Sequence, residues 1–145
     1  MAVTRLDNIS IVVESLDEAI GFFTELGLTL EGRQRIDDAW AGRVTGVPGQ
    51  RVEIAMLRTP DGHSRLELSQ FLTPPIAEDH RRAPVNALGY LRAMFTVDQL
   101  DDTVARLKAR GATLVGEIVN YENVYRLCYL RAPDGLLIGL AEELG

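Results

Sequence analysis

Hydrophobic and polar residues follow two different periods along the chain. Residues 9–13, Ile-Ser-Ile-Val-Val, carry apolar side chains at alternate positions, which predicts a strand with one buried face. In residues 16–26 the apolar positions recur at steps of three and four, which predicts an amphipathic helix. Ser15 or Asp17 would cap the start of this helix, and Gly27 would end it in a left-handed conformation.

The same signals return in the second half of the chain. Residues 13–32 (VESLDEAIGFFTELGLTLEG) align with residues 97–116 (VDQLDDTVARLKARGATLVG) at a constant offset of 84 positions, with seven identical residues. The matches run from the first strand through the helix and its glycine into the next strand. A chance similarity between two amphipathic helices would not extend so far, so the chain is predicted to contain an internal repeat.

Each half also contains a Pro-Asp-Gly turn between two strand-like segments. The turn at residues 60–62 separates residues 51–58 from 64–71, and the turn at residues 133–135 separates residues 125–131 from 136–142. Proline fixes the first turn position and Asp-Gly accommodates positive φ, so both segments are predicted hairpins. Each half therefore has the predicted order β-α-β-β-β, and the predicted fold class is α+β.

The two halves are predicted to form one domain that spans residues 1–145. The first module would occupy about residues 1–71 and the second about residues 90–145. The segment of about residues 72–89 holds three prolines and several charges, so we interpret it as a surface linker.

Composition narrows the classes of function. Hydrophobic residues make up 46% of the chain and charged residues 25%, as in ordinary globular proteins. The formal net charge of −6 argues against binding to nucleic acid or to an anionic membrane. The chain begins without an apolar secretion signal, and its single cysteine, Cys128, suits a reducing compartment. We therefore expect a cytoplasmic protein.

Paired βαβββ modules with V-x-x-L-D before the helix, L-G or R-G after it and P-D-G before the last strand resemble the vicinal oxygen chelate superfamily. That superfamily includes glyoxalase I, extradiol dioxygenases, fosfomycin resistance enzymes and bleomycin resistance proteins. The resemblance covers nearly the whole chain. It implies two curved sheets around a central cavity that holds a metal or ligand, and it implies a homodimer. Because this scaffold hosts both enzymes and non-catalytic binders, the function has to be argued from individual residues.

In metal-using relatives, the ligands lie on the first and last strands of each module. The resemblance places Asn8 and Glu67 at these positions in the first module, and Arg92 and Gly139 in the second. Matching Glu67 with Gly139 assumes one extra residue in the first hairpin turn. Glu67 is a carboxylate, but Asn8 offers only an amide oxygen, Gly139 has no side chain, and Arg92 is a permanent cation that repels metal ions. We therefore expect no metal and no cofactor.

The family geometry would direct alternate strand residues into the cavity. The residues expected there are Asn8, Ser10, Glu67, Ser69, Arg92, Met94 and Thr96. The residues expected to face the helices and form the core are Ile9, Ile11, Val13, Leu66, Leu68, Phe95 and Val97. Either Arg92 pairs with Glu67 across the pseudo-twofold axis, or Arg92 reaches solvent and Glu67 forms one wall of an acidic groove.

Three aromatic residues are weaker candidates for ligand contact. Trp40, Tyr121 and Tyr125 would stack on a planar or acyl ligand, and the alternative is that they seal the edge of a sheet.

Two functions follow from these residues. The first is a metal-independent protein of the bleomycin-resistance type that binds a small organic molecule, for example a cationic one, in its acidic cavity. The second is a lyase or isomerase in which Glu67 is the general base and Arg92 stabilises a developing oxyanion. A carboxylate beside a fixed cation is a weaker base, which favours the first reading.

Overall fold

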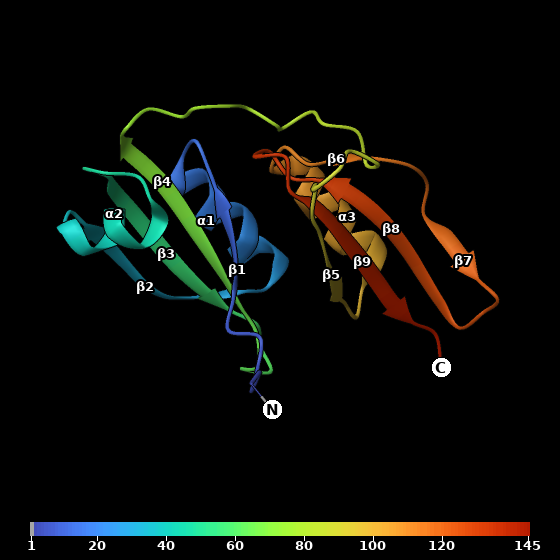
Figure 1. Cartoon of the computed structure of the whole chain (residues 1–145). Helices are drawn as coiled ribbons and strands as arrows, with labels where there is room; N and C mark the ends of the chain where they lie inside the picture. Colours follow the sequence, from blue (N-terminus) through green and yellow to red (C-terminus); the bar gives the residue numbers. More distant parts are fainter. Residues whose placement is uncertain (1) are drawn as a thin grey trace. The chain divides into compact units, whose positions relative to one another are not determined.

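The computed structural model describes residues 2–145, which divide after Glu78 into two compact units. Each unit contains one mixed sheet and one helix of ten or eleven residues. In Figure 1 the first unit runs from blue to green and the second from yellow to red, with each of these helices beside its own sheet. The α+β class predicted from the sequence is confirmed.

The first unit builds a four-stranded sheet in the order β1-β4-β3-β2. β1 runs parallel to β4, and the other neighbours are antiparallel. A short helix, α2, lies between β2 and β3. The elements are β1 (Ile9–Val12), α1 (Leu16–Leu26), β2 (Thr29–Ile36), α2 (Ala39–Thr45), β3 (Arg51–Arg58) and β4 (Arg65–Thr73).

The second unit repeats this topology in the order β5-β9-β8-β6, with β5 parallel to β9. It differs from the predicted β-α-β-β-β order because β6 has only two residues, and a further strand, β7, pairs with β8. The elements are β5 (Arg92–Thr96), α3 (Leu100–Ala109), β6 (Thr113–Leu114), β7 (Val119–Tyr121), β8 (Tyr125–Arg131) and β9 (Leu137–Glu143).

The two hairpin turns differ in length, as the sequence predicted. The first closes with a backbone hydrogen bond from Thr59 to Ser64, and the second with one from Ala132 to Leu136, one residue shorter. The strands after the turns nevertheless reach the same register. Glu67 pairs with Ser10 and Gly139 pairs with Met94, and Ser10 and Met94 are 84 positions apart. The expected equivalence of Glu67 and Gly139 is confirmed.

The first backbone N–H of each long helix donates to a side chain on the last strand of its unit. The backbone N–H of Leu16 donates to Oε1 of Gln70 at 2.7 Å, and that of Leu100 donates to Oε1 of Glu142 at 2.6 Å. Ser15 caps α1 as predicted, accepting from the N–H of Glu18. These contacts satisfy N–H groups that the first turn of a helix leaves without a partner.

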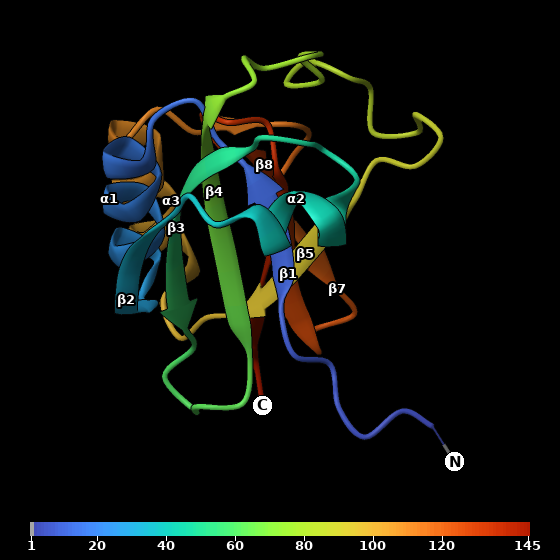
Figure 2. The same cartoon turned by 60° about the vertical axis from the view of Figure 1, so that its left-hand side comes forward.

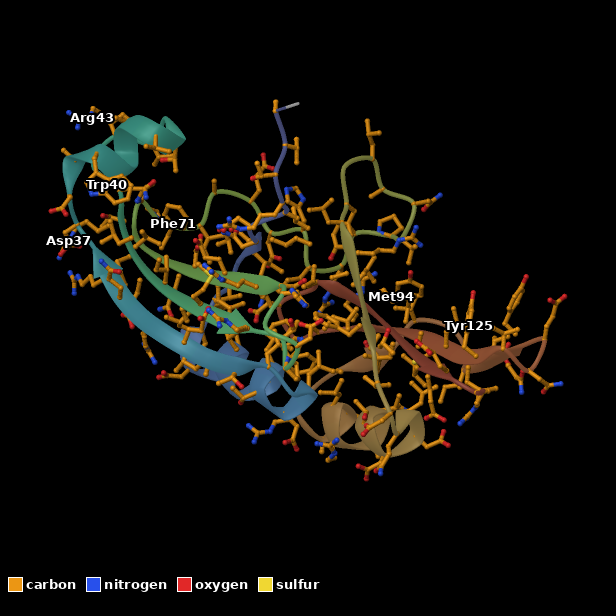
Figure 3. All side chains as sticks on the ribbon, turned by 90° about the horizontal axis from the view of Figure 1, so that it is seen from below. Asp37, Trp40, Arg43, Phe71, Met94 and Tyr125 are labelled. Atoms are coloured by element: carbon orange, nitrogen blue, oxygen red, sulfur yellow. The ribbon has the colours of Figure 1, made fainter. Side chains whose placement is uncertain are left out.

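The helices cover one face of each sheet. α1 packs on β3 and β4 and buries Leu16, Phe22 and Phe23 there. In the second unit α3 packs on β9 and buries Leu100 and Leu107. Figures 2 and 3 show that α2 lies on the opposite side of the first sheet from α1.

The expected core is only partly correct. Val13, Leu66 and Leu68 are buried as expected. The other four expected core residues are only half-buried: Ile9, Ile11, Phe95 and Val97. β1 and β5 are the outermost strands of their sheets, so the helix covers them less completely than it covers the central strands. Among residues 2–145, no helix combines the length and the apolar character needed to span a membrane.

Replacing Gln70 by Met is expected to lower the free energy of unfolding by about 1–2 kcal/mol, because the N–H of Leu16 loses its acceptor in a part-buried place. Gln70→Glu installs the side chain type that the second unit uses, and it should stay within about 0.5 kcal/mol of the wild type. Urea denaturation followed by circular dichroism measures both. Equal destabilisation by the two variants would show that the acceptor contributes nothing.

Candidate functional site

A row of polar side chains lies along β1 and β4 of the first unit. The Ser10 hydroxyl lies 3.2 Å from Oε1 of Glu67 and 3.0 Å from Oδ1 of Asn8, and its single hydrogen donates to one of them at a time. The Ser69 hydroxyl donates to the same Oε1 at 3.4 Å. Within residues 2–145, Oε2 of Glu67 therefore has no hydrogen-bond partner and can accept one from a ligand.

The N-terminal segment extends this row. Nδ2 of Asn8 donates to Oδ2 of Asp7 at 2.9 Å, and Arg5 pairs with Oδ1 of Asp7 at 3.0 Å. The hydrogen bonds from Asn8 and Arg5 hold the pKa of Asp7 below its usual range, so this exposed carboxylate is ionised at neutral pH. The row thus contains two carboxylates. Asp7 is paired with a cation, whereas Glu67 forms no ion pair within the described residues.

Apolar side chains continue the same face across β3. Met56 is paired with Glu67, and Ile54 is paired with Ser69, so both project from the face that carries the polar row. Both are half-buried. The first unit therefore offers a carboxylate with hydroxyl groups beside an apolar surface.

Trp40 lies on α2, beyond this row. Its side chain is 48% exposed, and Figure 3 shows it at the end of the first sheet where Phe71 also lies. Phe71 is four residues beyond Glu67, or roughly 13 Å along the strand. Trp40 is therefore near the site face, but it does not cover Glu67.

In the second unit, two side chains fill the space above Gly139. A Cβ atom at this position would lie 2.8 Å from Cε of Met94 and 2.9 Å from Cε1 of Tyr129. The Arg92 guanidinium lies over the ring of Tyr129, 5.3 Å from its centre, in a cation–π contact. The space that a side chain at position 139, the equivalent of Glu67, would fill is thus taken by the side chains of Met94 and Tyr129, with Arg92 beside them.

The other candidate residues of the second unit lie on the same face of the sheet as Gly139, but farther along the strands. Thr96 is exposed and paired with Ala141, two residues beyond Gly139. Tyr121 and Tyr125 are paired across β7 and β8, and their rings stack with centres 5.4 Å apart. Tyr125 pairs with Glu143, four residues beyond Gly139. The tyrosines therefore extend the open face of the sheet, meaning the face opposite its long helix, toward the β7–β8 hairpin. Figure 3 labels Met94 and Tyr125 on this face.

The structure brings the predicted site residues together within each unit. Asn8, Ser10, Glu67 and Ser69 form one connected group, and Arg92 and Met94 adjoin the Gly139 position. Glu67 and Arg92 belong to different units, so their pairing stays a prediction.

The sequence analysis missed Tyr129, whose ring lies over Gly139 and beneath the Arg92 guanidinium. Its place two residues before Arg131 on a predicted strand, in step with Tyr125 and Leu127, was a signal for this face.

Cys128 lies on the other face of β8. Its side chain is 3% exposed, and burial raises the pKa of its thiol. It is a core residue and not an activated nucleophile. Within residues 2–145, no three His, Cys, Asp or Glu side chains are arranged to hold a metal ion.

A family model described as the Glyoxalase/Bleomycin resistance protein/Dioxygenase superfamily matches residues 5–140. This match includes Asn8, Glu67, Arg92 and Gly139. The chain belongs to this superfamily.

Solved structures of similar proteins share the fold. A glyoxalase family protein from Bacillus cereus is 67% identical, with a TM-score of 0.96 and coverage of 100% of this chain and 99% of that one. A mutant of the fosfomycin resistance protein FosX from Listeria monocytogenes, in complex with Mn(II) and 1S,2S-dihydroxypropylphosphonic acid, is 14% identical, with a TM-score of 0.63 and coverage of 99% and 91%. TnmS3, an antibiotic-binding protein from Streptomyces sp. CB03234, is 21% identical, with a TM-score of 0.62 and coverage of 99% and 98%. No curated protein matches the chain.

In this superfamily member, Gly139→Ala is expected to lower the free energy of unfolding by about 1–3 kcal/mol, because the new methyl group would crowd Met94 and Tyr129. Gly32→Ala is the matched control, since Gly32 also lies in a strand but a Cβ there would meet nothing within 4 Å. Adding Met94→Ala to Gly139→Ala should recover part of the loss. Chemical denaturation measures all three, and a Gly139→Ala protein as stable as Gly32→Ala would contradict the crowding.

Proposed function

We propose that this superfamily member binds a small organic molecule without a metal ion, in the cavity that the family fold implies between its two modules. The donor set supports this proposal. Three protein ligands are usual for a catalytic metal, and the four family positions supply one carboxylate and one amide. Arg92 adds a permanent positive charge, and Gly139 adds no donor at all.

The crowding above Gly139 is the observation that carries the proposal. A vacated ligand position would leave space in which a larger residue, a water molecule or a metal could sit. Here Met94 and Tyr129 fill that space, and Arg92 lies on the tyrosine ring. The residues present therefore do not fit a metal centre, because restoring a carboxylate at position 139 would require both side chains to move.

The chemistry of the two open faces suggests the class of ligand. Oε2 of Glu67 accepts a hydrogen bond or a cationic group, and Ser10 and Ser69 hold the other oxygen in place. Met56 and Ile54 in the first unit, and the stacked Tyr121 and Tyr125 in the second, are suited to the apolar or planar body of a ligand. An amphipathic organic molecule with a cationic or hydrogen-bond-donating group satisfies both requirements.

A lyase or isomerase activity is the second candidate function. The observation that favours it is that Ser10 and Ser69 both approach Oε1 of Glu67, which leaves Oε2 as the atom that would take a proton from a substrate. Arg92 would then stabilise the resulting oxyanion. This function requires Glu67 and Arg92 to act on one bound molecule, whereas simple binding does not.

The homodimer that the resemblance implies and the cytoplasmic location expected from the sequence remain part of the proposal. An open, partly apolar sheet face requires cover, which a second copy would provide. Light scattering that finds only a particle of monomer mass in dilute buffer would contradict the dimer.

The purified protein is expected to contain well below one equivalent of zinc, nickel, iron or manganese, because one carboxylate and one amide are too few for tight binding. Elemental analysis measures the metal content, and a chelator should leave the thermal midpoint unchanged. Stoichiometric metal that disappears in Glu67→Gln would contradict the proposal.

A thermal-shift screen with cationic antibiotics, coenzyme A thioesters and glutathione adducts is expected to find ligands that raise the thermal midpoint. For a cationic ligand, Glu67→Gln should weaken binding about tenfold or more, since it removes the charge that the ligand contacts. Glu117→Gln removes the same charge from an exposed position and is the matched control. Equal weakening by both variants would show that only the net charge matters.

The same ligands separate binding from catalysis. If the protein is a lyase or isomerase, a bound thioester or adduct is converted, and Glu67→Gln abolishes turnover while the ligand is still bound. NMR spectroscopy and chiral chromatography of the ligand after incubation measure conversion, because an isomerised product has the same mass as its substrate. Recovery of every bound ligand unchanged would contradict the enzymatic function and leave the binding function in place.

A further inference from the structure

A pocket of about 500 Å³ lies in the second unit, at the end of β8 where the segment of residues 79–90 meets the sheet. Its lining includes Asp79, Arg81, Arg82, Thr113, Arg131 and Pro133. In Figure 1 this segment is the yellow-green chain that reaches β6. None of these residues belongs to the site proposed above, and all of them lie in one unit.

Arg131 holds the segment against the sheet. Its Nη1 donates to the carbonyl oxygen of Arg81 at 3.1 Å and to the hydroxyl of Tyr90 at 3.0 Å. Tyr90 in turn donates to the carbonyl oxygen of Gly135. Gly135 has a φ of +92°, and a Cβ there would lie 2.5 Å from Cα of Arg81, so the segment lies directly on the turn. The pocket wall is therefore built by specific contacts.

The charges of the lining are unbalanced. Arg81 is neutralised by Asp79, which it contacts through Nε at 3.0 Å and Nη2 at 2.6 Å. These bonds lower the pKa of Asp79 to about 2, so the carboxylate stays ionised at neutral pH. Neither Arg82 nor Arg131 makes an ion pair within residues 2–145, although Asp79 also attracts Arg82 electrostatically. The pocket thus has an excess of two positive charges in a chain whose net charge is −6.

Donor groups also remain available in the pocket. Within residues 2–145, Arg131 donates hydrogen bonds only through Nη1, and its guanidinium also lies over the ring of Tyr90, 5.6 Å from the ring centre. Its Nε and Nη2 remain as donors for a ligand. Arg82 is exposed and makes no hydrogen bond through its side chain within residues 2–145. Thr113 is paired with Arg131 across β6 and β8, and its hydroxyl has no hydrogen-bond partner within residues 2–145.

We propose that this pocket binds the dianionic phosphate group of a small organic molecule through Arg82, Arg131 and Thr113. Guanidinium groups bind phosphate oxygens in bidentate geometry, and a dianion matches the excess charge. A volume of about 500 Å³ is within the usual range for ligand pockets and leaves room for an organic body beside the phosphate. The overall acidity of the chain repels free anions, so binding here requires the local cluster.

Isothermal titration calorimetry of the whole protein with glycerol 3-phosphate, at fixed ionic strength, tests the proposal. Saturable binding is expected, with glycerol alone giving none and inorganic phosphate binding more weakly, because it lacks the organic body. Affinity should increase from about pH 5 to about pH 7.5, because the phosphomonoester takes its second negative charge near pH 6.

Arg82→Gln should weaken this binding about tenfold or more, since it removes one charged donor without breaking any contact of the fold. Arg43→Gln is the matched control, because it removes the same charge from an exposed place on α2 in the first unit. Thr113→Glu, which places a carboxylate in the pocket, should abolish binding while the circular dichroism spectrum stays unchanged. Absence of saturable binding, equal weakening by Arg82→Gln and Arg43→Gln, or unchanged binding in Thr113→Glu would each overturn the proposal.

Discussion

The open face of each unit depends on the parallel pairing of its first strand with its last. This pairing places Ser10 beside Glu67 in the first unit and Met94 beside Gly139 in the second, although the partners are far apart in the sequence. The helix packs on the opposite face and is held there by a side chain of the last strand, Gln70 or Glu142. One strand therefore fixes both the start of the helix and the candidate site.

The two units share this framework, but the side chains on their open faces differ chemically. At equivalent positions, the first unit has a carboxylate between two hydroxyl groups, and the second has a glycine beneath methionine and tyrosine. A polar cluster needs hydrogen-bond partners in place, whereas an aromatic and thioether surface packs without them. The first unit therefore presents hydrogen-bonding groups on this face, whereas the second presents a mainly aromatic and apolar surface.

The segment of residues 79–90, which follows the first unit, is also held in place by specific contacts. Arg131, Tyr90 and Gly135 fix residues 79–90 on the β8–β9 turn and bring Arg82 near Arg131. Without these contacts the two arginines would be separate surface charges in an acidic protein. Gly135 is decisive here because its missing side chain lets the backbone of Arg81 approach.

The sequence by itself determined the two long helices and the strands of both hairpins, but not α2 or β7. Apolar periodicity predicted α1 and its limits at Ser15 and Gly27, and the two Pro-Asp-Gly turns predicted both hairpins. The resemblance to the superfamily, with one extra residue in the first turn, implied that Glu67 and Gly139 are equivalent. These features depend on local backbone preferences and on the strict alternation of strand residues, which can be read from neighbouring positions.

Only the tertiary structure decided what each of these side chains touches. It brought the hydroxyls of Ser10 and Ser69 to Glu67, placed Arg92 on the ring of Tyr129, and closed the space over Gly139. It also made Ile9 and Ile11 half-buried, because β1 became an outermost strand. Such contacts depend on which strands become neighbours and on the direction that long side chains take, and neither is encoded within a short stretch of sequence.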